Sequence, residues 1–520
     1  MTVFIMISLS VVLSTLILSA TCTLRTDQQF WKDLAKNELE EALRVKWNLK
    51  PAKNVILMIG DGMGPNTITA TRIFAGGESH RLAYEMFPHM GLLKTYSADK
   101  IVPDSACTAT ALFSGVKSNK DTVGVDASVK RGDCLRSLVP ETRLPSLAAK
   151  AMEMGKSAGF VTTMRVTHAT PSPLYAHSAD RSWECDANMR EGTEQCKDIA
   201  RQLVEDEPGK NLQVIMGGGR TLMVSSDELP ENQWTCVRKD GKNLIEDYKK
   251  DKESRGLKYS VVSSKSELEN VRFNETDYLM GIFASSHLSY EYQKNGTDSP
   301  TLPEMVEAAI KVLQKNDKGY FLMIEGGNID MAHHRGRAKL AIDEAVVFEQ
   351  AVKKAMSLTS EEDTLLIVTS DHTHTLNING YPDRGSNIFG IAEASDYDGV
   401  NYTTLSYSNG GPESFQFNVT VDNQNRTVVM RRDPSLEDTD SFDYHQVAGI
   451  RVIENMHGGG DVNIYARGPH AHLFHNVHEQ NYVYHAIMYA SAYSAGYCAH
   501  PSVVLIATII LGIFIGLLFY

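Results

Sequence analysis

Acidic and histidine side chains follow directly after short apolar runs at residues 54–59, 320–324 and 364–368, and after the segment that ends at Thr167. A further cluster of this kind spans residues 457–461. The candidate ligands are Asp61, His168, Thr170, Glu325, Asp330, His334, Asp371, His372, His374 and His457. Each motif alone is more often a turn or a satisfied pair of polar residues, so the prediction depends on their occurring together.

Carboxylates gathered at one edge of a sheet repel each other unless cations neutralise them. A mixture of carboxylate and imidazole ligands suits zinc, whereas Asp, Glu and hydroxyl oxygens suit magnesium that keeps some of its waters. The pattern therefore predicts a metal centre with both kinds of site.

Ser105 lies in the segment Val102-Pro103-Asp104-Ser105-Ala106 and precedes an Ala/Thr-rich run that is typical of a helix. The start of a helix favours anions such as phosphate. On this segment alone, Ser105 or Asp104 is expected only to cap the helix, and next to a metal both roles can coexist. Gly-x-Ser-x-Gly is absent around Ser105, which disfavours a nucleophile-elbow hydrolase.

The elements that must position these residues alternate along the chain. Apolar runs predict strands at residues 54–59, 159–163, 212–216, 320–324 and 364–368. Helical periodicity predicts helices at residues 144–154, 194–204, 302–313 and 338–356. This alternation indicates an α/β fold around a mostly parallel sheet, in which ligands bind beyond the carboxyl ends of the strands.

Two regions depart from the alternation. Residues 28–49 have helical periodicity and predict a peripheral arm within residues 21–50. Residues 388–451 are rich in polar residues and predict an exposed surface insertion, with a separate small β domain as the alternative. The catalytic α/β domain is then expected at residues 51–387 and 452–490.

Composition excludes several classes of protein. The 520 residues are 42% hydrophobic and 22% charged, which does not fit disordered, collagen-like or polytopic membrane chains. A formal net charge of −13 argues against general nucleic-acid binding, which requires clustered Lys and Arg.

Both ends resemble processing signals. Residues 1–20 form an apolar run that closes on small residues and predict a signal peptide. Residues 503–520 are apolar, and residues 491–502 contain small residues that include Ser494, followed by a polar spacer at residues 497–501. This order predicts a GPI anchor attached at Ser494. A transmembrane helix is the alternative. Sequons that agree with this secretory route occur at Asn274, Asn295, Asn401, Asn418 and Asn425.

Six segments closely resemble animal alkaline phosphatases of the membrane-bound, GPI-anchored type. The matching segments, in unbroken order, are residues 54–65, 102–111, 161–181, 325–334, 369–374 and 468–482. The resemblance implies an alkaline-phosphatase-like sandwich with a crown-like insertion, on the outer face of the cell membrane. It further implies a homodimer that hydrolyses phosphate monoesters to inorganic phosphate through a phosphoserine, with two zinc ions and one magnesium ion.

The resemblance also implies roles for single residues. Ser105 corresponds to the phosphorylated nucleophile, and Arg181 corresponds to the guanidinium that holds two phosphate oxygens. The implied ligands are Asp330, His334 and His457 for one zinc, Asp61, Asp371 and His372 for the other, and Asp61, Thr170 and Glu325 for magnesium. His168 is expected beside the magnesium ligands, with His374 and Glu454 along the pocket.

The chain departs from the family pattern at several positions. Met331 stands where vertebrate members have a histidine, which changes the hydrogen bonding expected near magnesium. Phe283-Ala284 lacks a carboxylate of the family's calcium site, so calcium is not predicted. Connectivity of the seven cysteines does not follow from their spacing. Cys134 and Cys196 match a pair of the family, we expect Cys185 and Cys236 to form a second, and Cys107 is expected to be buried and unpaired.

Two other functions remain open from the sequence. A surface glycoprotein could keep this fold for binding alone, but a pure binding module has no physical need for a nucleophile, an arginine and complete metal ligands. A sulfatase or phosphodiesterase of the same superfamily is the second alternative, and the segment after Ser105 lacks the Cys/Ser-x-Pro-x-Arg motif of sulfatases.

Overall fold

The computed structural model describes residues 27–225, 236, 238–415 and 417–492. The chain divides into two compact units between Lys46 and Trp47. The predicted signal peptide, the hydrophobic tail, Ser494, Cys22 and Cys498 lie outside the described residues. Among the helices that are described, none has the length and apolar character needed to cross a membrane.

The first unit contains helix α2 (Gln28–Arg44), which has no buried residue. The Asp27 carboxylate caps it by accepting the backbone N–H of Phe30 at 2.9 Å. The helix ends five residues before the predicted end at residue 49, because Val45 adopts an extended conformation.

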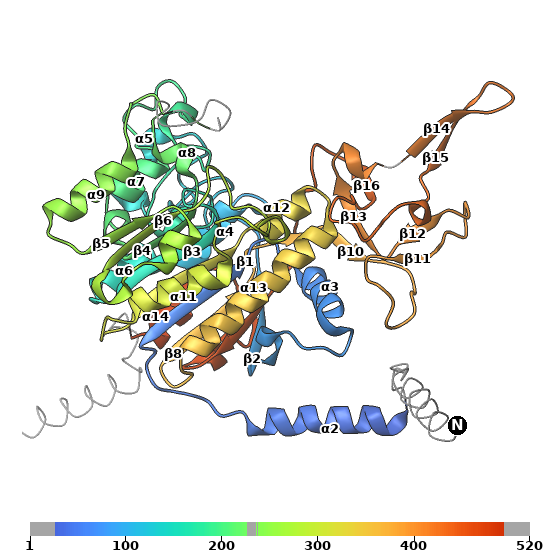
Figure 1. The fold of residues 1–520 in the computed structure, drawn as a ribbon, viewed down its shortest axis with the longest axis horizontal. Helices are drawn as coiled ribbons and strands as arrows, with labels where there is room; N and C mark the ends of the chain where they lie inside the picture. The colour runs from blue at the N-terminus through green and yellow to red at the C-terminus, as the bar shows by residue number, and fades with distance from the viewer. Residues whose placement is uncertain (1–26, 226–235, 237, 416, 493–520) are drawn as a thin grey trace, which may run out of the picture. The chain divides into compact units, whose positions relative to one another are not determined.

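The second unit is built on a ten-stranded sheet, in the order β19-β2-β18-β8-β1-β7-β3-β4-β6-β5 (Figure 1). Only β18 runs antiparallel to its neighbours among these ten strands. Their bounds are β1 (Asn54–Gly60), β2 (His89–Lys94), β3 (Ser157–Arg165), β4 (Val214–Gly218), β5 (Tyr259–Val262), β6 (Tyr278–Ile282), β7 (Tyr320–Gly326), β8 (Thr364–Thr369), β18 (Val462–Arg467) and β19 (Asn476–Glu479).

All five predicted strands are present as β1, β3, β4, β7 and β8. Strand β4 begins two residues later than predicted, because residues 209–211 form a short 3-10 turn that the N–H of Leu212 closes on the carbonyl of Gly209 at 3.1 Å. Their continuous apolar sequence fits strands whose two faces are both covered.

The helices of the second unit also follow the periodicity. Helix α11 (Leu302–Leu313) has the predicted bounds, and α13 (Ala338–Leu358) runs two residues further. Helices α6 (Leu147–Glu153) and α7 (Ile199–Glu205) begin later than predicted, because Ser146 and Asp198 cap them. The other helices are α3 (Pro65–Gly76), α4 (Ser105–Ser114), α5 (Cys134–Ser137), α8 (Arg220–Met223), α9 (Leu244–Ser254), α10 (Lys265–Glu269), α12 (Asn328–His334) and α14 (Tyr482–Ala490).

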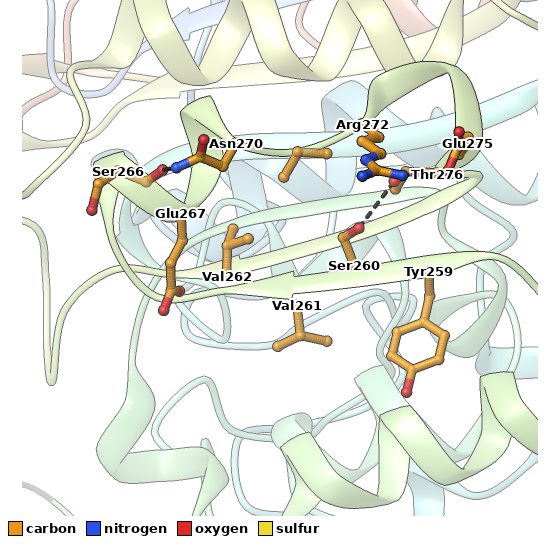
Figure 2. Close-up of a pocket in the computed structure, with 11 residues that line it drawn as sticks. Tyr259, Ser260, Val261, Val262, Ser266, Glu267, Asn270, Arg272, Glu275 and Thr276 are labelled. Atoms are coloured by element: carbon orange, nitrogen blue, oxygen red, sulfur yellow. Dashed lines mark hydrogen bonds and ion pairs between the residues drawn. The ribbon is translucent and has the colours of Figure 1, made fainter.

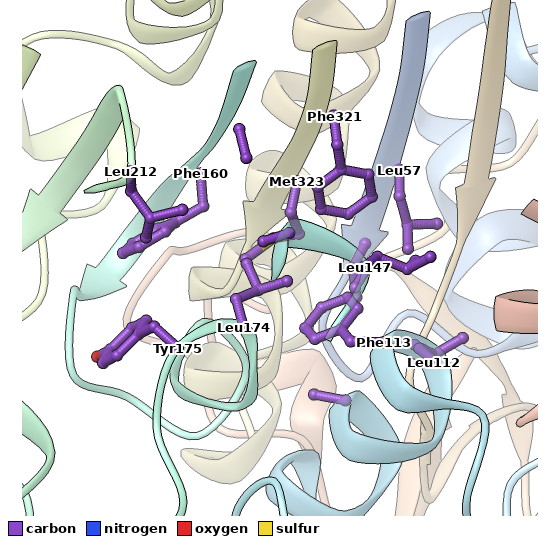
Figure 3. Packing of buried hydrophobic residues seen from close by; sticks show 14 of the residues in the cluster. Leu57, Leu112, Phe113, Leu147, Phe160, Leu174, Tyr175, Leu212, Phe321 and Met323 are labelled. Atoms are coloured by element: carbon purple, nitrogen blue, oxygen red, sulfur yellow. The ribbon is translucent and has the colours of Figure 1, made fainter. Parts of the chain in front are cut away.

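Alternate residues of the strands pack into separate cores on the two faces of the sheet. Leu57 of β1 packs with Phe321 and with Phe113 of α4 on one face, as Figure 3 shows. Ile56 of the same strand joins the opposite core with residues of α11 and α13, including Phe348. Burying apolar surface at about 25 cal/mol per Å² on both faces makes the central strands a rigid support.

The predicted insertion at residues 388–451 contains short strands and 3-10 turns, and no α-helix is described in it. Its strands are β11 (Ile391–Ala394), β12 (Asn401–Thr403), β13 (Leu405–Gly410), β14 (Phe417–Val421), β15 (Thr427–Arg431) and β16 (Ala448–Arg451). Strand β13 pairs with β10 (Leu376–Ile378). Tyr407 of β13 belongs to a core with Ala70 of α3 and Ile342 of α13, so the segment shares a core with the main fold.

The cysteines pair as expected, and the sequon asparagines differ in exposure. Disulfides join Cys134 to Cys196 and Cys185 to Cys236, and Cys107 is buried and unpaired. Four of the sequon asparagines are exposed, whereas the Asn401 amide donates to the carboxylate of Asp433 at 3.1 Å.

Glu344 of α13 is a buried acid outside the predicted site. Its side chain is 5% exposed, and Oε1 accepts the backbone N–H of Glu291 at 2.6 Å. Burial raises the pKa of Glu344 from 4.5 to about 8, although the nearby Lys294 ammonium opposes the rise. Between pH 4.5 and about pH 8, the folded state therefore holds one more proton than the unfolded state. The free energy of unfolding falls as pH rises through this range.

Glu344→Gln keeps the acceptor but cannot ionise, so the variant should gain stability over the original chain as pH rises. We expect the difference in melting temperature between the two proteins to grow by about 2 °C from pH 5 to pH 9. Differential scanning calorimetry measures it, with the exposed Glu269→Gln as control. A difference independent of pH would contradict the assigned protonation.

Candidate active site

The predicted ligands meet at the carboxyl ends of three neighbouring strands. Asp61 follows β1, Glu325 lies near the end of β7, and Asp371 follows β8. Strand β1 lies between the other two, with Ile59 in register with both Glu325 and Thr369. Parallel strands end at one edge of the sheet, so this register brings the three carboxylates together.

A tight turn after β1 makes room for the histidines. Gly62 has φ of +67°, and a Cβ there would lie 2.6 Å from Cδ2 of His374. A side chain is excluded both by the backbone conformation and by the imidazole. The turn therefore keeps Asp61 against the segment after β8.

The first group of ligands surrounds Asp330 at the start of α12. His374 Nε2 lies 2.5 Å from Asp330 Oδ1, and His334 Nε2 lies 3.3 Å from Oδ2. His457 Nε2 lies 3.5 Å from Oδ1 and 3.1 Å from His334 Nε2. These contacts gather the three residues predicted for one zinc and add His374, which the sequence placed only along the pocket.

The second group surrounds Ser105. His372 Nε2 lies 3.3 Å from both Asp61 Oδ1 and Asp371 Oδ2. Ser105 Oγ is 3.1 Å from His372 Nε2 and 3.5 Å from both Asp61 oxygens. The three residues predicted for the second zinc thus lie around the predicted nucleophile.

The third group lies on the other side of Asp61. Its ligand atoms come from Asp61, His168 and Glu325 and lie within 4.8 Å of one another. Thr170 Oγ1 donates to Asp61 Oδ2 at 3.4 Å. Thr162 Oγ1 donates to Glu325 Oε2 at 2.5 Å, a contact that the sequence analysis did not identify.

Burial and mutual repulsion dominate the electrostatics. Burial, together with the carboxylates of Asp371 and Asp330, raises the pKa of Asp61 well above its usual range. Burial also raises the pKa of Glu325 to about 7. Burial would raise the pKa of Asp330 too, but the imidazoles of His334 and His374 hold it well below its usual range.

The residues present fit divalent cations. Glu325 Oε1 and His168 Nδ1 are buried, and neither has a hydrogen-bond partner among the described residues. Such atoms cost free energy unless a ligand satisfies them. Clusters of buried carboxylates and imidazoles around Asp330 and Asp61 place ligand atoms close enough together to hold metal ions.

Arg181 and the start of helix α4 lie next to the acids and histidines described above. Asp104 caps helix α4 by accepting the N–H groups of Ala106 and Cys107, which leaves Ser105 as the first helical residue. Arg181 Nη1 donates to Asp104 Oδ2 at 3.0 Å, and its Nη2 lies 3.3 Å from His168 Nε2. Asp104 thus contacts both the guanidinium of Arg181 and the helix start at Ser105.

Glu454 and Met331, two of the predicted site residues, lie at the margin of the site. Glu454 is 64% exposed, and its Oε1 lies 3.9 Å from His334 Nδ1. Met331 packs in an apolar cluster with Tyr290, Ala332 and Leu340. The thioether therefore contributes packing where a histidine would contribute a hydrogen-bonding ring.

Asn455 is a site residue that the sequence analysis missed. Its Oδ1 accepts from His374 Nδ1 at 2.6 Å, and its backbone carbonyl accepts from His334 Nδ1 at 2.6 Å. Both histidines are thereby turned with Nε2 toward Asp330. The only sequence signal was its position two residues before His457.

A separate cavity of about 570 Å³ lies beside edge strand β5, away from these groups (Figure 2). The Ser260 and Thr276 hydroxyls hydrogen-bond there at 2.9 Å. Its lining contains none of the predicted ligands, so the cavity is not the site described above.

Known proteins resemble this chain over most of its length. A family model described as alkaline phosphatase matches residues 52–493. The tissue-nonspecific alkaline phosphatase of Felis catus is 42% identical over 493 residues, covering 92% of this chain and 91% of the relative. The membrane-bound alkaline phosphatase of Bombyx mori is 36% identical, covering 91% of this chain and 86% of the relative.

Solved structures agree in fold. The alkaline phosphatase of Thermus thermophilus has a TM-score of 0.60 at 23% identity, covering 86% of this chain and 93% of that chain. The enzyme from the Antarctic bacterium TAB5 has a TM-score of 0.57, also at 23% identity, covering 86% of this chain and 99% of that chain. At this identity the likeness supports the fold alone.

Asn455→Ala should weaken metal retention. His374 loses the side-chain oxygen that accepts from its Nδ1, and the backbone carbonyl that accepts from His334 Nδ1 loses the support of the Asn455 side chain. We expect zinc affinity to fall about 10–100-fold, as is typical when a residue that orients a ligand is removed. Zinc-loaded protein is dialysed against graded chelator, and the remaining metal is measured by mass spectrometry. The control is Asn377→Ala, whose half-buried side chain donates to Ser408 Oγ and to the Thr375 carbonyl. Equal chelator midpoints for the two variants would contradict this role of Asn455.

Proposed function

Because the chain belongs to the alkaline phosphatase family, we propose that it hydrolyses phosphate monoesters through a phosphoserine formed on Ser105. We further propose two zinc ions and one magnesium ion as its cofactors. The observation that carries the proposal is the placement of Ser105 Oγ 3.1 Å from His372 Nε2 and beside Asp61, at the head of α4.

The residues divide into cation ligands and phosphate ligands. Zinc would be held by Asp330, His334 and His457 in one site and by Asp61, Asp371 and His372 in the other, and magnesium by Asp61, Thr170 and Glu325. When bound, the cations supply positive charge that favours the alkoxide form of serine and stabilises the departing oxygen.

Ser105 carries the chemical step. The Ser105 hydroxyl loses its proton to solvent, and its Oγ attacks phosphorus to form an Oγ–P bond. The bond from phosphorus to the alcohol oxygen breaks, and the alcohol leaves with a proton taken from solvent. Water then attacks the phosphoserine, which restores the hydroxyl and releases inorganic phosphate. Ser105 is well placed for both steps because it is 2% exposed and fixed at the first turn of α4.

Arg181 binds the phosphoryl group in this proposal. Its planar guanidinium matches two phosphate oxygens, which suits a reaction in which positioning and charge stabilisation supply most of the catalysis. Asp104 holds Nη1 and thereby fixes the plane of the guanidinium. The start of α4 adds backbone N–H groups beside Ser105.

We also propose that the mature protein is a glycosylated homodimer, attached to the outer face of the cell membrane through a GPI anchor. The pattern of residues 491–520 supports the anchor. The membrane-bound name of the Bombyx mori relative agrees with this location. Nucleic acid is not among the proposed partners, given the net charge of −13.

Ser105→Ala removes the proposed nucleophile without adding bulk. We expect kcat for an aryl phosphate at alkaline pH to fall by at least about 10³-fold. Ser114→Ala is the matched control, because Ser114 ends the same helix and its buried Oγ has no hydrogen-bond partner among the described residues. Full activity of Ser105→Ala would disprove the phosphoserine mechanism.

The anchor can be tested on cells that express the whole chain. Phosphatidylinositol-specific phospholipase should release phosphatase activity into the medium, because it cleaves the lipid from a GPI anchor. A chain shortened at residue 502 should be secreted without the phospholipase, since it lacks the hydrophobic tail. Activity that stays on treated membranes would favour a transmembrane tail.

A further inference from the structure

Two carboxylates that are not among the predicted site residues are joined by one guanidinium near Arg181. Arg131 Nη1 donates to Asp121 Oδ2 at 2.6 Å, and Arg131 Nε donates to Asp180 Oδ2 at 2.9 Å. A third contact joins Arg131 Nη2 to Asp180 Oδ1 at 3.4 Å. Asp180 directly precedes Arg181 in the chain, so Arg131 holds the backbone next to the proposed phosphate ligand.

Asp121 connects the two halves of the proposed phosphate site through its backbone. Its N–H donates to Asp104 Oδ1 at 2.9 Å, and its carbonyl accepts the N–H of Arg181 at 2.9 Å. Asp104 in turn caps the helix of Ser105 and pairs with Arg181 Nη1. A shift of Asp121 would therefore move the proposed nucleophile and the proposed phosphate ligand relative to each other.

The conformation of Asp121 requires outside support. Its φ is +66°, in the left-handed region, which residues other than glycine adopt at a cost even though aspartate and asparagine adopt it more often than most. The carboxylate is held by Arg131 at 2.6 Å and by Lys120 Nζ at 3.0 Å. The strained residue is thus fixed at both its backbone and its side chain.

Charge balance gives Arg131 a second effect. The Asp121 and Asp180 side chains are 12% and 1% exposed, so water screens them poorly. Asp180 has Arg190 as a second cation, but at 3.9 Å and on a side chain that is 69% exposed. Without Arg131, the negative field beside Arg181 would increase, and a dianionic phosphate would be repelled.

We propose that Arg131 is a positioning residue that aligns Arg181 and neutralises Asp121 and Asp180, so that the site binds the phosphoryl group more tightly. The inference rests on the proposed role of Arg181. Arginine suits this task better than lysine, because its planar fork reaches two carboxylates at once.

Arg131→Ala should raise KM for an aryl phosphate and Ki for inorganic phosphate together, by about 10-fold, while kcat changes by less than about threefold. Arg131→Lys should recover part of the lost affinity, since it restores the charge but not the bridge. Arg131→Gln provides a second neutral variant if the alanine variant does not fold. The stabilising shift in melting temperature that inorganic phosphate produces should shrink in both neutral variants.

Arg136→Ala is the matched control. Arg136 lies on α5 in the same segment, and its guanidinium contacts Ser128 Oγ at 3.2 Å. Its kinetic constants should equal those of the original chain. A purely structural role for Arg131 predicts a lower melting temperature with an unchanged Ki, and unchanged Ki in both neutral variants would overturn the inference.

The same assays separate this inference from the proposed function. If the original chain is inactive, or if Ser105→Ala is fully active, the proposed function fails. If the original chain is active and phosphate binds all Arg131 variants equally, only the role of Arg131 fails.

Discussion

Buried negative charge at the carboxyl edge of the sheet is the constraint on which the site depends. Asp61, Glu325 and Asp371 are each 0% exposed, and they lie at the carboxyl ends of three strands that lie side by side. Ionised carboxylates without partners are costly in such a place, and here protonation and divalent cations are the available remedies. The surrounding imidazoles and the unpartnered Glu325 Oε1 favour cations. In the proposed mechanism, cations held near Ser105 would also stabilise the phosphoryl group.

The sheet can hold that charge because its central strands are packed on both faces. The apolar residues that alternate along β1 belong to two different cores, so movement of this strand would disturb both. Close-packed protein interiors resist small displacements. Histidines from less regular segments are fixed differently, by single acceptors such as Asn455 for His374 and the Pro103 carbonyl for His457. Rigid strands thus position the carboxylates, and individual hydrogen bonds orient the imidazoles.

The phosphate side of the site has the opposite electrostatic requirement. It needs positive charge for a dianion, yet Arg181 lies among the carboxylates of Asp104, Asp121 and Asp180. Asp104 combines two tasks, since it caps the helix of Ser105 and fixes the guanidinium of Arg181. The carboxylates of Asp121 and Asp180 pair with other cations. Lys120 contacts Asp121, and Arg131 contacts both acids.

The sequence by itself determined the fold class and the main strands and predicted the candidate ligands, because apolar runs followed by acids and histidines are local patterns. It did not determine helix starts such as those of α6 and α7, where Ser146 and Asp198 begin the helix later than the periodicity indicates. Only the tertiary structure decided which side chains support the ligands. Asn455, Thr162 and Arg131 act across 81, 163 and 49 residues of sequence, respectively, and no local pattern records such pairings. Strand register and chain folding bring them to the site, since a hydrogen bond or a charge pair depends on distance in space.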